Sequence, residues 1–241
     1  MYQPRTYRRW VKAPDLISFR VVVKETDLMI LAERSLEGEA LSLVNKFRNA
    51  FEDYIKIDPL FLTSLEPIPV TEEMPPIARQ MAEAAKMVGV GPMAAVAGAI
   101  AQSVGEELGK ISPEVIIENG GDNYLLSHHD RVVGIYAGSS PLSGRVGLVI
   151  KASEMPVGVC TSSGTVGHSL SFGSADAVTV VSPSAFLADA AATAIGNLIN
   201  SAEDFSHGFE LAKSIPGILG VILIKGDKIG AWGDVELCTI R

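Results

Sequence analysis

Cysteine, aromatic residues and basic charge are all scarce in this sequence. Cys160 and Cys238 are its only cysteines and no CxxC pair occurs, so the sequence predicts neither a disulfide framework nor a thiolate metal site. Aromatic residues make up 6%, so the core must consist mainly of Ala, Val, Ile and Leu, which suits helices packed closely on sheets. A net charge of −8 excludes nucleic acid as the main partner, because phosphate binding requires a basic surface.

Strong hydrophobic runs are also missing. Residues 87–105 carry no charge, but Pro92, several glycines and many alanines make this stretch a poor membrane span, so we expect no membrane association. The basic N-terminus, with Arg5, Arg8, Arg9 and Lys12, is not followed by the apolar segment of a signal peptide, and we expect a cytoplasmic protein. These basic residues are either a solvated leader or a segment that folds over an anionic ligand.

The order of the predicted elements favours a single α+β domain over residues 1–241. Short β-rich runs joined by turns dominate, without the regular alternation of strand and helix that a doubly wound sheet requires. Strands are predicted at residues 17–24, 28–33, 115–118, 124–126, 131–137, 146–152, 177–181, 219–224 and 229–235. Helices are predicted at residues 36–54, 77–88, from 92 onward, after 184 and at 205–214, with a proline-rich loop at 59–76. The apolar share of 47% is compatible with a homodimer.

A carboxylate and a hydroxyl are spaced one helical turn apart after the strand at 177–181. Ser182 and Ser184 are both candidate N-caps for the helix that follows. Within it, Asp189 and Thr193 are four residues apart and share a face, so both oxygens can reach one hard cation such as Mg²⁺. The alternative is a solvated acid near the helix start and a threonine bonded to a backbone carbonyl.

Glycine and hydroxyl side chains are concentrated just before that strand. Thr161, Ser162, Ser163, Gly164 and Thr165 predict a flexible loop whose backbone N–H groups can converge on an anion, although a loop without a ligand has the same composition. His168 follows among small residues, as an acid–base group, a phosphate donor or a histidine bonded to a local carbonyl.

A third cluster lies in the middle of the chain. Asn119, Gly120, Gly121 and Asp122 predict a tight turn with positive φ between two strands. Asn119 and Asp122 can contact a ligand there, but the requirements of the turn also explain both residues. The small residues of the helix from Pro92 allow another helix or a ligand to approach closely.

Together these segments resemble the ApbE superfamily, the flavin transferases once called thiamine-biosynthesis lipoproteins, and more closely its shorter uncharacterised cytoplasmic relatives. Asn119-Gly120-Gly121-Asp122 followed by Val133-Gly134-Ile135 is similar to the family's N-x-G-G-D and V-G-I pattern. Val159 to Gly164 is similar to its V-A-T-S-G loop. Residues 178–185 and 188–194 resemble its most specific segment, a strand and a helix with the sequence A-D-A-x-x-T-A.

The resemblance implies an ApbE-type α+β fold with antiparallel sheets covered by helices, and FAD or a related flavin nucleotide as the ligand. It implies that Asp189 and Thr193 bind Mg²⁺ together with a backbone carbonyl from residues 91–95. It places His168 at the position of a catalytic histidine, and the turn at 119–122 and the loop at 161–165 at the cofactor. The implied activity is that of an FMN transferase or an FAD diphosphatase.

Two features of the transferases are missing from this sequence. His168 is followed by Ser-Leu-Ser-Phe-Gly rather than the H-I-x-x-P-x-T-G pattern, and residues 91–98 lack the lysine of the K-G-Y-A segment. The resemblance therefore supports the ligand site more directly than the transfer step. Some shorter relatives are associated with anaerobic homocysteine formation, so the alternative function is a non-catalytic or sulfur-transfer factor in sulfur assimilation, with Cys160 as the residue of interest.

Overall fold

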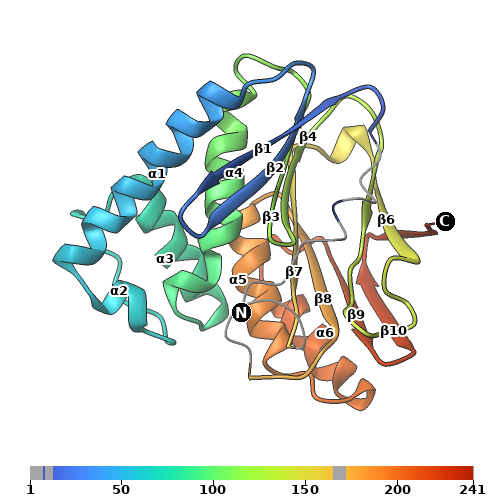
Figure 1. Ribbon diagram of the computed structural model, residues 1–241. Helices are drawn as coiled ribbons and strands as arrows, with labels where there is room; N and C mark the ends of the chain where they lie inside the picture. Colours follow the sequence, from blue (N-terminus) through green and yellow to red (C-terminus); the bar gives the residue numbers. More distant parts are fainter. Residues whose placement is uncertain (1–7, 9–12, 165–171, 241) are drawn as a thin grey trace.

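The β-rich runs pair into one antiparallel sheet of eight strands, in the order β1-β2-β3-β4-β7-β8-β9-β10 (Figure 1). The computed structural model describes residue 8 and residues 13–164 and 172–240. The strands of this sheet are β1 (Ile17–Val23), β2 (Thr26–Ala32), β3 (Val115–Asn119), β4 (Asp122–Leu126), β7 (Val157–Ser162), β8 (Ala177–Ser182), β9 (Gly220–Lys225) and β10 (Lys228–Gly233). The predicted N-terminal hairpin and the hairpin around Gly226 are both confirmed.

A smaller antiparallel sheet covers part of one face of the large sheet. Its order is β11-β6-β5, with β5 (Arg131–Gly134), β6 (Val146–Ile150) and β11 (Glu236–Thr239). Ile222 and Ile224 of β9 point toward this small sheet, where they share a core with Leu148 and Ile150 of β6. The period of two along a strand then directs Val221 and Leu223 to the opposite face.

Helices cover that opposite face (Figure 1). They are α1 (Glu37–Ile57), α2 (Leu60–Thr63), α3 (Pro76–Val88), α4 (Val96–Leu108), α5 (Ala185–Gly196) and α6 (Phe205–Ser214), and a 3₁₀ turn, η2 (Pro92–Ala95), precedes α4. The large sheet therefore lies between a layer of helices and a small sheet, and the predicted α+β class is confirmed.

One α-helix and two strands were not predicted from the sequence. Helix α2 lies inside the proline-rich stretch expected to be a loop, and β11 follows the last predicted strand. Strand β7 includes Thr161 and Ser162, so the flexible loop expected from residue 161 is wrong for these two residues. The hydroxyl and glycine content of this segment hid a β-strand whose Val157, Gly158, Val159 and Cys160 are all buried.

The small residues of the helix after Pro92 serve packing within the fold. A Cβ on Gly105 would lie 2.2 Å from Cδ1 of Tyr124, and one on Gly98 would lie 2.2 Å from the carbonyl oxygen of Ala185. Within the described residues no single helix is long and apolar enough to cross a membrane. Taken together, the helical segments Pro76–Val88 and Pro92–Leu108 have the length and apolar composition of a membrane span, but they are bent by 104° at the break between them.

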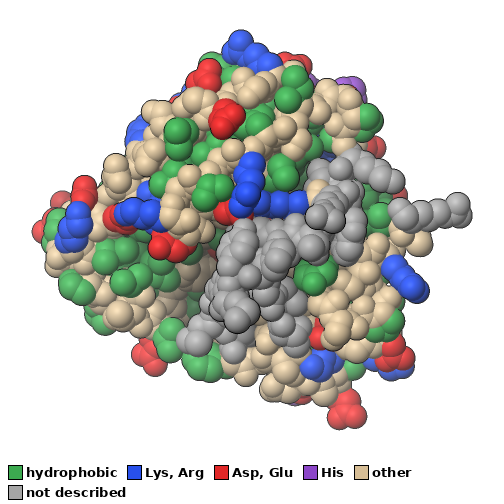
Figure 2. Space-filling view, in the orientation of Figure 1, with side chains coloured by type: hydrophobic (Ala, Val, Ile, Leu, Met, Phe, Trp, Pro, Cys, Tyr) green, Lys and Arg blue, Asp and Glu red, His purple; other side chains and the backbone are tan. Residues whose placement is uncertain are grey.

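Exposed hydrophobic side chains gather around α2, at the left of the space-filling view (Figure 2). Ile57, Leu60, Leu62 and Leu65 each expose half or more of their surface. Acidic residues are mixed among the same elements, with Asp53 and Asp58 nearby in the sequence. The apolar surface there is bordered by charges of both signs, since Asp53 pairs with Lys56 at 2.7 Å.

Candidate functional site

Helix α5 is packed tightly against β7 because the strand has a glycine at the contact. A Cβ on Gly158 would lie 2.4 Å from Cα of Ala185, so only glycine fits at this distance. The hydroxyl of Ser184 accepts a hydrogen bond from the backbone N–H of Leu187 at 3.4 Å, which confirms one of the two predicted N-caps. Nearly every residue of α5 is buried, so the helix is held in a fixed position against the sheet.

The carboxylate of Asp189 is buried at the start of a neighbouring helix. Its side chain is 9% exposed, so the alternative of a solvated acid is wrong for this residue. Oδ2 accepts the backbone N–H of Gly98 at 2.8 Å, and the N–H of Ala97 also donates to this carboxylate. These N–H groups belong to the first turn of α4, where they have no partner within the helix, so Asp189 acts as its N-cap from another helix.

Thr193 lies one turn further along α5 and is partly exposed. None of the side-chain hydrogen bonds between described residues involves its hydroxyl, which leaves that oxygen available to a ligand. Residues 91–95, from which a carbonyl ligand was expected, form the turn η2 directly before α4, and η2 packs against α5. The metal-binding residues inferred from the sequence thus come from two elements in contact.

The turn at residues 119–122 meets the same end of α4. Gly120 and Gly121 have φ values of 73° and 113°, as the turn prediction requires, and Asn119 pairs with Asp122 across the hairpin. The side-chain amide of Asn119 donates to the carbonyl oxygen of Ala97 at 3.1 Å. The hairpin and Asp189 therefore contact adjacent residues in the first turn of α4.

Asp122 is the acidic residue of this turn, and the charge of Asp189 acts on it. It is 8% exposed, and its carboxylate accepts the backbone N–H of Thr161 and contacts the thiol of Cys160. Burial raises its pKa well above the usual value, and the charges of Asp189 and Glu118 raise it further. Burial likewise raises the pKa of Asp189 to about 7, although the N–H groups of Gly98 and Ala97 oppose the shift.

Strand β7 sorts its side chains between the two faces of the sheet. Cys160 points to the helix layer, where its Sγ lies 3.5 Å from the carbonyl oxygen of Ala185. Ser162 points the same way and lies near Gly196 of α5. The hydroxyl of Thr161 instead bonds that of Thr179 at 2.9 Å on the opposite face. Thr161 can therefore contribute to the site through its backbone but not through its hydroxyl.

The rest of the expected loop is only partly described. Gly164 donates its backbone N–H to the carbonyl oxygen of Ala175 at 2.9 Å, which ties the end of β7 to the residues before β8. Ser163 adjoins it at the end of the strand. Thr165 and His168 lie outside the described residues.

The structure adds a buried ion-pair cluster that sequence reasoning did not identify. The guanidinium of Arg8 bonds Glu118, and it bonds Oδ1 of Asp27 at 2.8 Å. The other carboxylate oxygen of Glu118 accepts the backbone N–H of Gly121 at 2.9 Å. Arg8 is therefore not a solvated residue, and it stabilises the turn that carries Asp122; Arg5, Arg9 and Lys12 lie outside the described residues. No spacing in the sequence links residues 8, 27 and 118.

The oxygen atoms of this site suit a hard cation better than a soft one. Among the described residues, no three His, Cys, Asp or Glu side chains are grouped to hold a metal ion. A cation here would need the carboxylate of Asp189, the hydroxyl of Thr193 and backbone oxygens, which is the ligand chemistry of Mg²⁺. The buried carboxylates fit such an ion, because they have no cationic side chain as a partner among the described residues.

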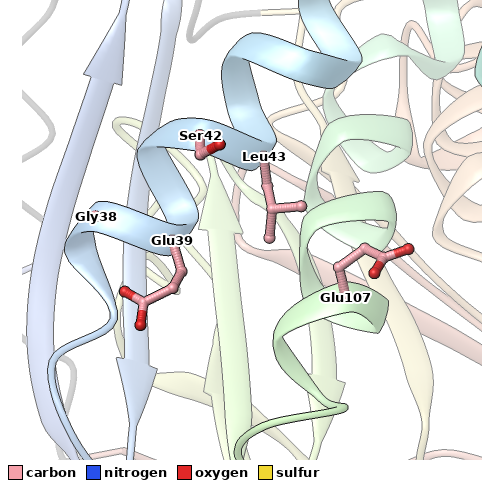
Figure 3. Close-up of a pocket in the computed structure, with 5 residues that line it drawn as sticks. All are labelled: Gly38, Glu39, Ser42, Leu43 and Glu107. Carbon is pink, nitrogen blue, oxygen red and sulfur yellow. The ribbon is translucent and has the colours of Figure 1, made fainter.

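Two cavities lined by described residues lie elsewhere. One, of about 560 Å³, is a wide groove between α1 and α4, lined by Glu39, Ser42 and Leu43 of α1 and Glu107 of α4; the carboxylates of Glu39 and Glu107 point away from each other (Figure 3). The other, of about 130 Å³, lies beside β6 and includes Leu148 and Val181. The large groove offers two carboxylates, one of which already pairs with Lys110 at 2.8 Å, so it adds little to the site at α4 and α5.

Comparison with known proteins gives the family. A family model described as "AbpE bacteria" matches residues 8–207, from Arg8 to the start of α6. The chain belongs to this ApbE family. It is 43% identical over 220 residues to a UPF0280 protein of Methanosarcina barkeri, covering 90% of this chain and 87% of that protein. It is 41% identical over 222 residues to a UPF0280 protein of Methanocaldococcus jannaschii, covering 90% of each.

Solved structures show the ApbE fold at low sequence identity. The apo form of the flavinyl transferase ApbE of Pseudomonas stutzeri superposes with a TM-score of 0.54 at 14% identity, over 90% of this chain and 93% of that one. The flavin transferase ApbE of Vibrio cholerae gives 0.52 at 14% identity, over 90% and 96%. The resemblance inferred from the sequence motifs is confirmed at the level of family and fold.

Proposed function

We propose that this ApbE-family protein binds FAD through Mg²⁺ and uses it as an FMN transferase or an FAD diphosphatase. One observation supports the proposal most directly. Asp189 of α5 and the turn at 119–122 come from distant parts of the sequence and both contact the first turn of α4. The names of the structurally similar transferases supply the class of ligand, a flavin.

The residues have separate roles in this proposal. The N–H groups of Gly98 and Ala97 orient the Asp189 carboxylate, and with Thr193 it would hold the ion. Bound Mg²⁺ would neutralise the diphosphate of FAD. The hydroxyl of Ser162, on the helix face near the end of β7, would donate to the remaining phosphate charge, because the N–H of Gly164 is already bonded to Ala175. His168 would transfer a proton to or from the attacking group.

Both reactions break the same bond. In hydrolysis a water oxygen bonds to phosphorus of the FMN half, the P–O bond to the AMP half breaks, and a proton leaves the water, giving FMN and AMP. In transfer, an acceptor hydroxyl takes the place of water, so the products are the flavinylated acceptor and AMP. Released AMP therefore reports either reaction.

Calorimetry with FAD and assay of released AMP test the proposal. We expect FAD binding by the wild type to require Mg²⁺, and Asp189→Ala to lose both binding and AMP release. Asp227→Ala is the control, because Asp227 lies in the exposed hairpin between β9 and β10 and should behave as wild type. An Asp189→Ala protein that folds, binds FAD and releases AMP normally would show that the site is wrongly assigned.

The alternative, a factor for sulfur assimilation, stays a prediction, and Cys160 lends it no support. The thiol is fully buried, and burial together with the charges of Asp122 and Asp189 raises its pKa, so it is held as an unreactive thiol. A homocysteine auxotrophy assay in a deletion strain tests this function without reference to flavin.

A further inference from the structure

Asp122 has a buried oxygen without a hydrogen-bond partner among the described residues. This atom, Oδ1, is shielded from solvent, while the other interactions of the carboxylate are with the N–H of Thr161 and the thiol of Cys160. A buried carboxylate oxygen without a partner is unfavourable, because nothing offsets its loss of hydration. Such a group calls for a partner that the described part of the chain does not supply.

The direction of Asp122 follows from the strand. Asp122 lies two residues before Tyr124, whose ring packs on Gly105 of α4, so both side chains are on the helix face of the sheet. Cys160, which contacts the Asp122 carboxylate, is on the same face and lies against Ala185 of α5. The unpartnered oxygen is therefore in the layer that contains Asp189, and the charge of Asp189 acts on it.

Two carboxylates without a counter-charge are unfavourable in such a place. Arg8 lies beside Glu118 on the neighbouring strand, but its guanidinium is bound to Asp27 and Glu118. Neither Asp122 nor Asp189 takes part in an ion pair with a described lysine or arginine. A shared proton can reduce the repulsion, but a divalent cation also satisfies the open oxygen and needs anionic oxygen ligands.

We propose that Asp122 is a ligand of the same divalent cation as Asp189, so that the ion joins strand β4 to helix α5. This inference rests on the proposed function and extends it, because the cation would have two carboxylates from different elements rather than one. It also gives the turn at 119–122 a specific purpose. The glycines, the Asn119 contact with Ala97 and the Glu118 contact with Gly121 fix the place of the second carboxylate.

Binding of Mn²⁺ to the protein without nucleotide tests the inference, measured by calorimetry and by electron paramagnetic resonance of the bound ion. Outer-shell partners of metal sites typically contribute about 10- to 100-fold in affinity, and a direct ligand should contribute at least as much. We expect Asp122→Asn, which keeps the side-chain shape, to raise the Kd for Mn²⁺ at least about tenfold. Asp227→Asn is the matched control and should leave the Kd unchanged.

The outcomes separate the two proposals. If Asp189→Asn loses Mn²⁺ while Asp122→Asn binds as wild type, the open oxygen holds only a proton, and this inference fails while the proposed function stands. If wild type and Asp189→Asn both fail to show specific binding, the proposed Mg²⁺ site itself fails.

A second variant guards against poor folding of Asp122→Asn, which circular dichroism would reveal. Asp122→Glu keeps the charge and displaces it by one methylene group. A weaker Kd together with an altered Mn²⁺ spectrum would support direct ligation. A wild-type Kd and spectrum would overturn it.

Discussion

Asp189 satisfies the first turn of α4 and is itself destabilised by burial. Its carboxylate accepts N–H groups from Gly98 and Ala97, which favour the charged form, yet desolvation outweighs them and raises its pKa to about 7. The spacing of Asp189 and Thr193 could be predicted from the sequence because helical periodicity sets it. The burial of Asp189 could not be predicted, because it depends on the packing of α4 over α5, and these segments are about 90 residues apart in the sequence.

This shift predicts how the metal-free protein responds to pH. Between the unfolded pKa of 3.8 and the folded value of about 7, the native state binds more protons than the unfolded state. The free energy of unfolding should therefore fall as pH rises through this window, by at most about 1.4 kcal/mol per pH unit for one group. Asp189→Asn should remove the contribution of this group and leave that of Asp122, whose pKa is also raised by burial. Urea unfolding in EDTA at pH 5, 6 and 7 measures it.

Asp204→Asn is the control for this experiment. Backbone N–H groups of Asn200 and Ser201 lower the pKa of Asp204, so its contribution is lost only as pH falls below the ordinary range of a carboxyl. Its variant should keep the wild-type slope between pH 5 and 7. An equal slope in Asp189→Asn and wild type would contradict the prediction.

At the scale of elements, most strands and helices could be predicted from local pattern. The hairpins, α1, α3, α5 and α6 follow from periodicity and turn residues, and even the positive φ values at Gly120 and Gly121 follow from the sequence. Strand β7 was hidden because its glycine and hydroxyl side chains are typical of loops. Its strand conformation depends on pairing with β4 and β8 on both sides, which is information that a single segment does not carry.

The contact between β7 and α5 predicts the effect of one methyl group. In Gly158→Ala the new Cβ would lie 2.4 Å from Cα of Ala185, so α5 must move away from the sheet. Overpacking of this kind typically costs about 1–3 kcal/mol in the free energy of unfolding. Because α5 carries Asp189 and Thr193, we also expect weaker Mn²⁺ binding. Denaturant unfolding and Mn²⁺ calorimetry measure the two effects.

Gly38→Ala provides the comparison. Gly38 lies in the first turn of α1 and a Cβ there would meet nothing within 4 Å, so the variant should be as stable as wild type or slightly more stable. It should bind Mn²⁺ normally. Gly158→Ala protein with wild-type stability would mean that the close approach of α5 to β7 is wrong.

At the scale of the whole molecule, the large sheet separates two cores with different tasks. The helix layer carries Asp122, Asp189 and Thr193, whereas the small sheet packs on the opposite face and contributes none of the candidate site residues. The small sheet should therefore support stability without direct effect on the site. Its edge strand β11 pairs with β6, and Ile240 beyond it packs over Gly134 and Gly147.

Removal of residues 235–241 tests this division of labour. The truncation deletes β11, Val235 and Ile240 and uncovers Leu148 of β6, so we expect a loss on the order of 2–4 kcal/mol in the free energy of unfolding. At a temperature where the shortened chain is folded, its Kd for Mn²⁺ should stay within about twofold of wild type, because the deleted strand lies across the sheet from Asp189. Glu236→Ala is the control, because it removes only the ion pair between Glu236 and Lys151. The Glu236 side chain is 58% exposed, so this variant should change the free energy of unfolding by less than about 0.5 kcal/mol. A folded truncation that no longer binds Mn²⁺ would show that the two faces of the sheet are coupled, and the assignment of the small sheet to stability alone would be wrong.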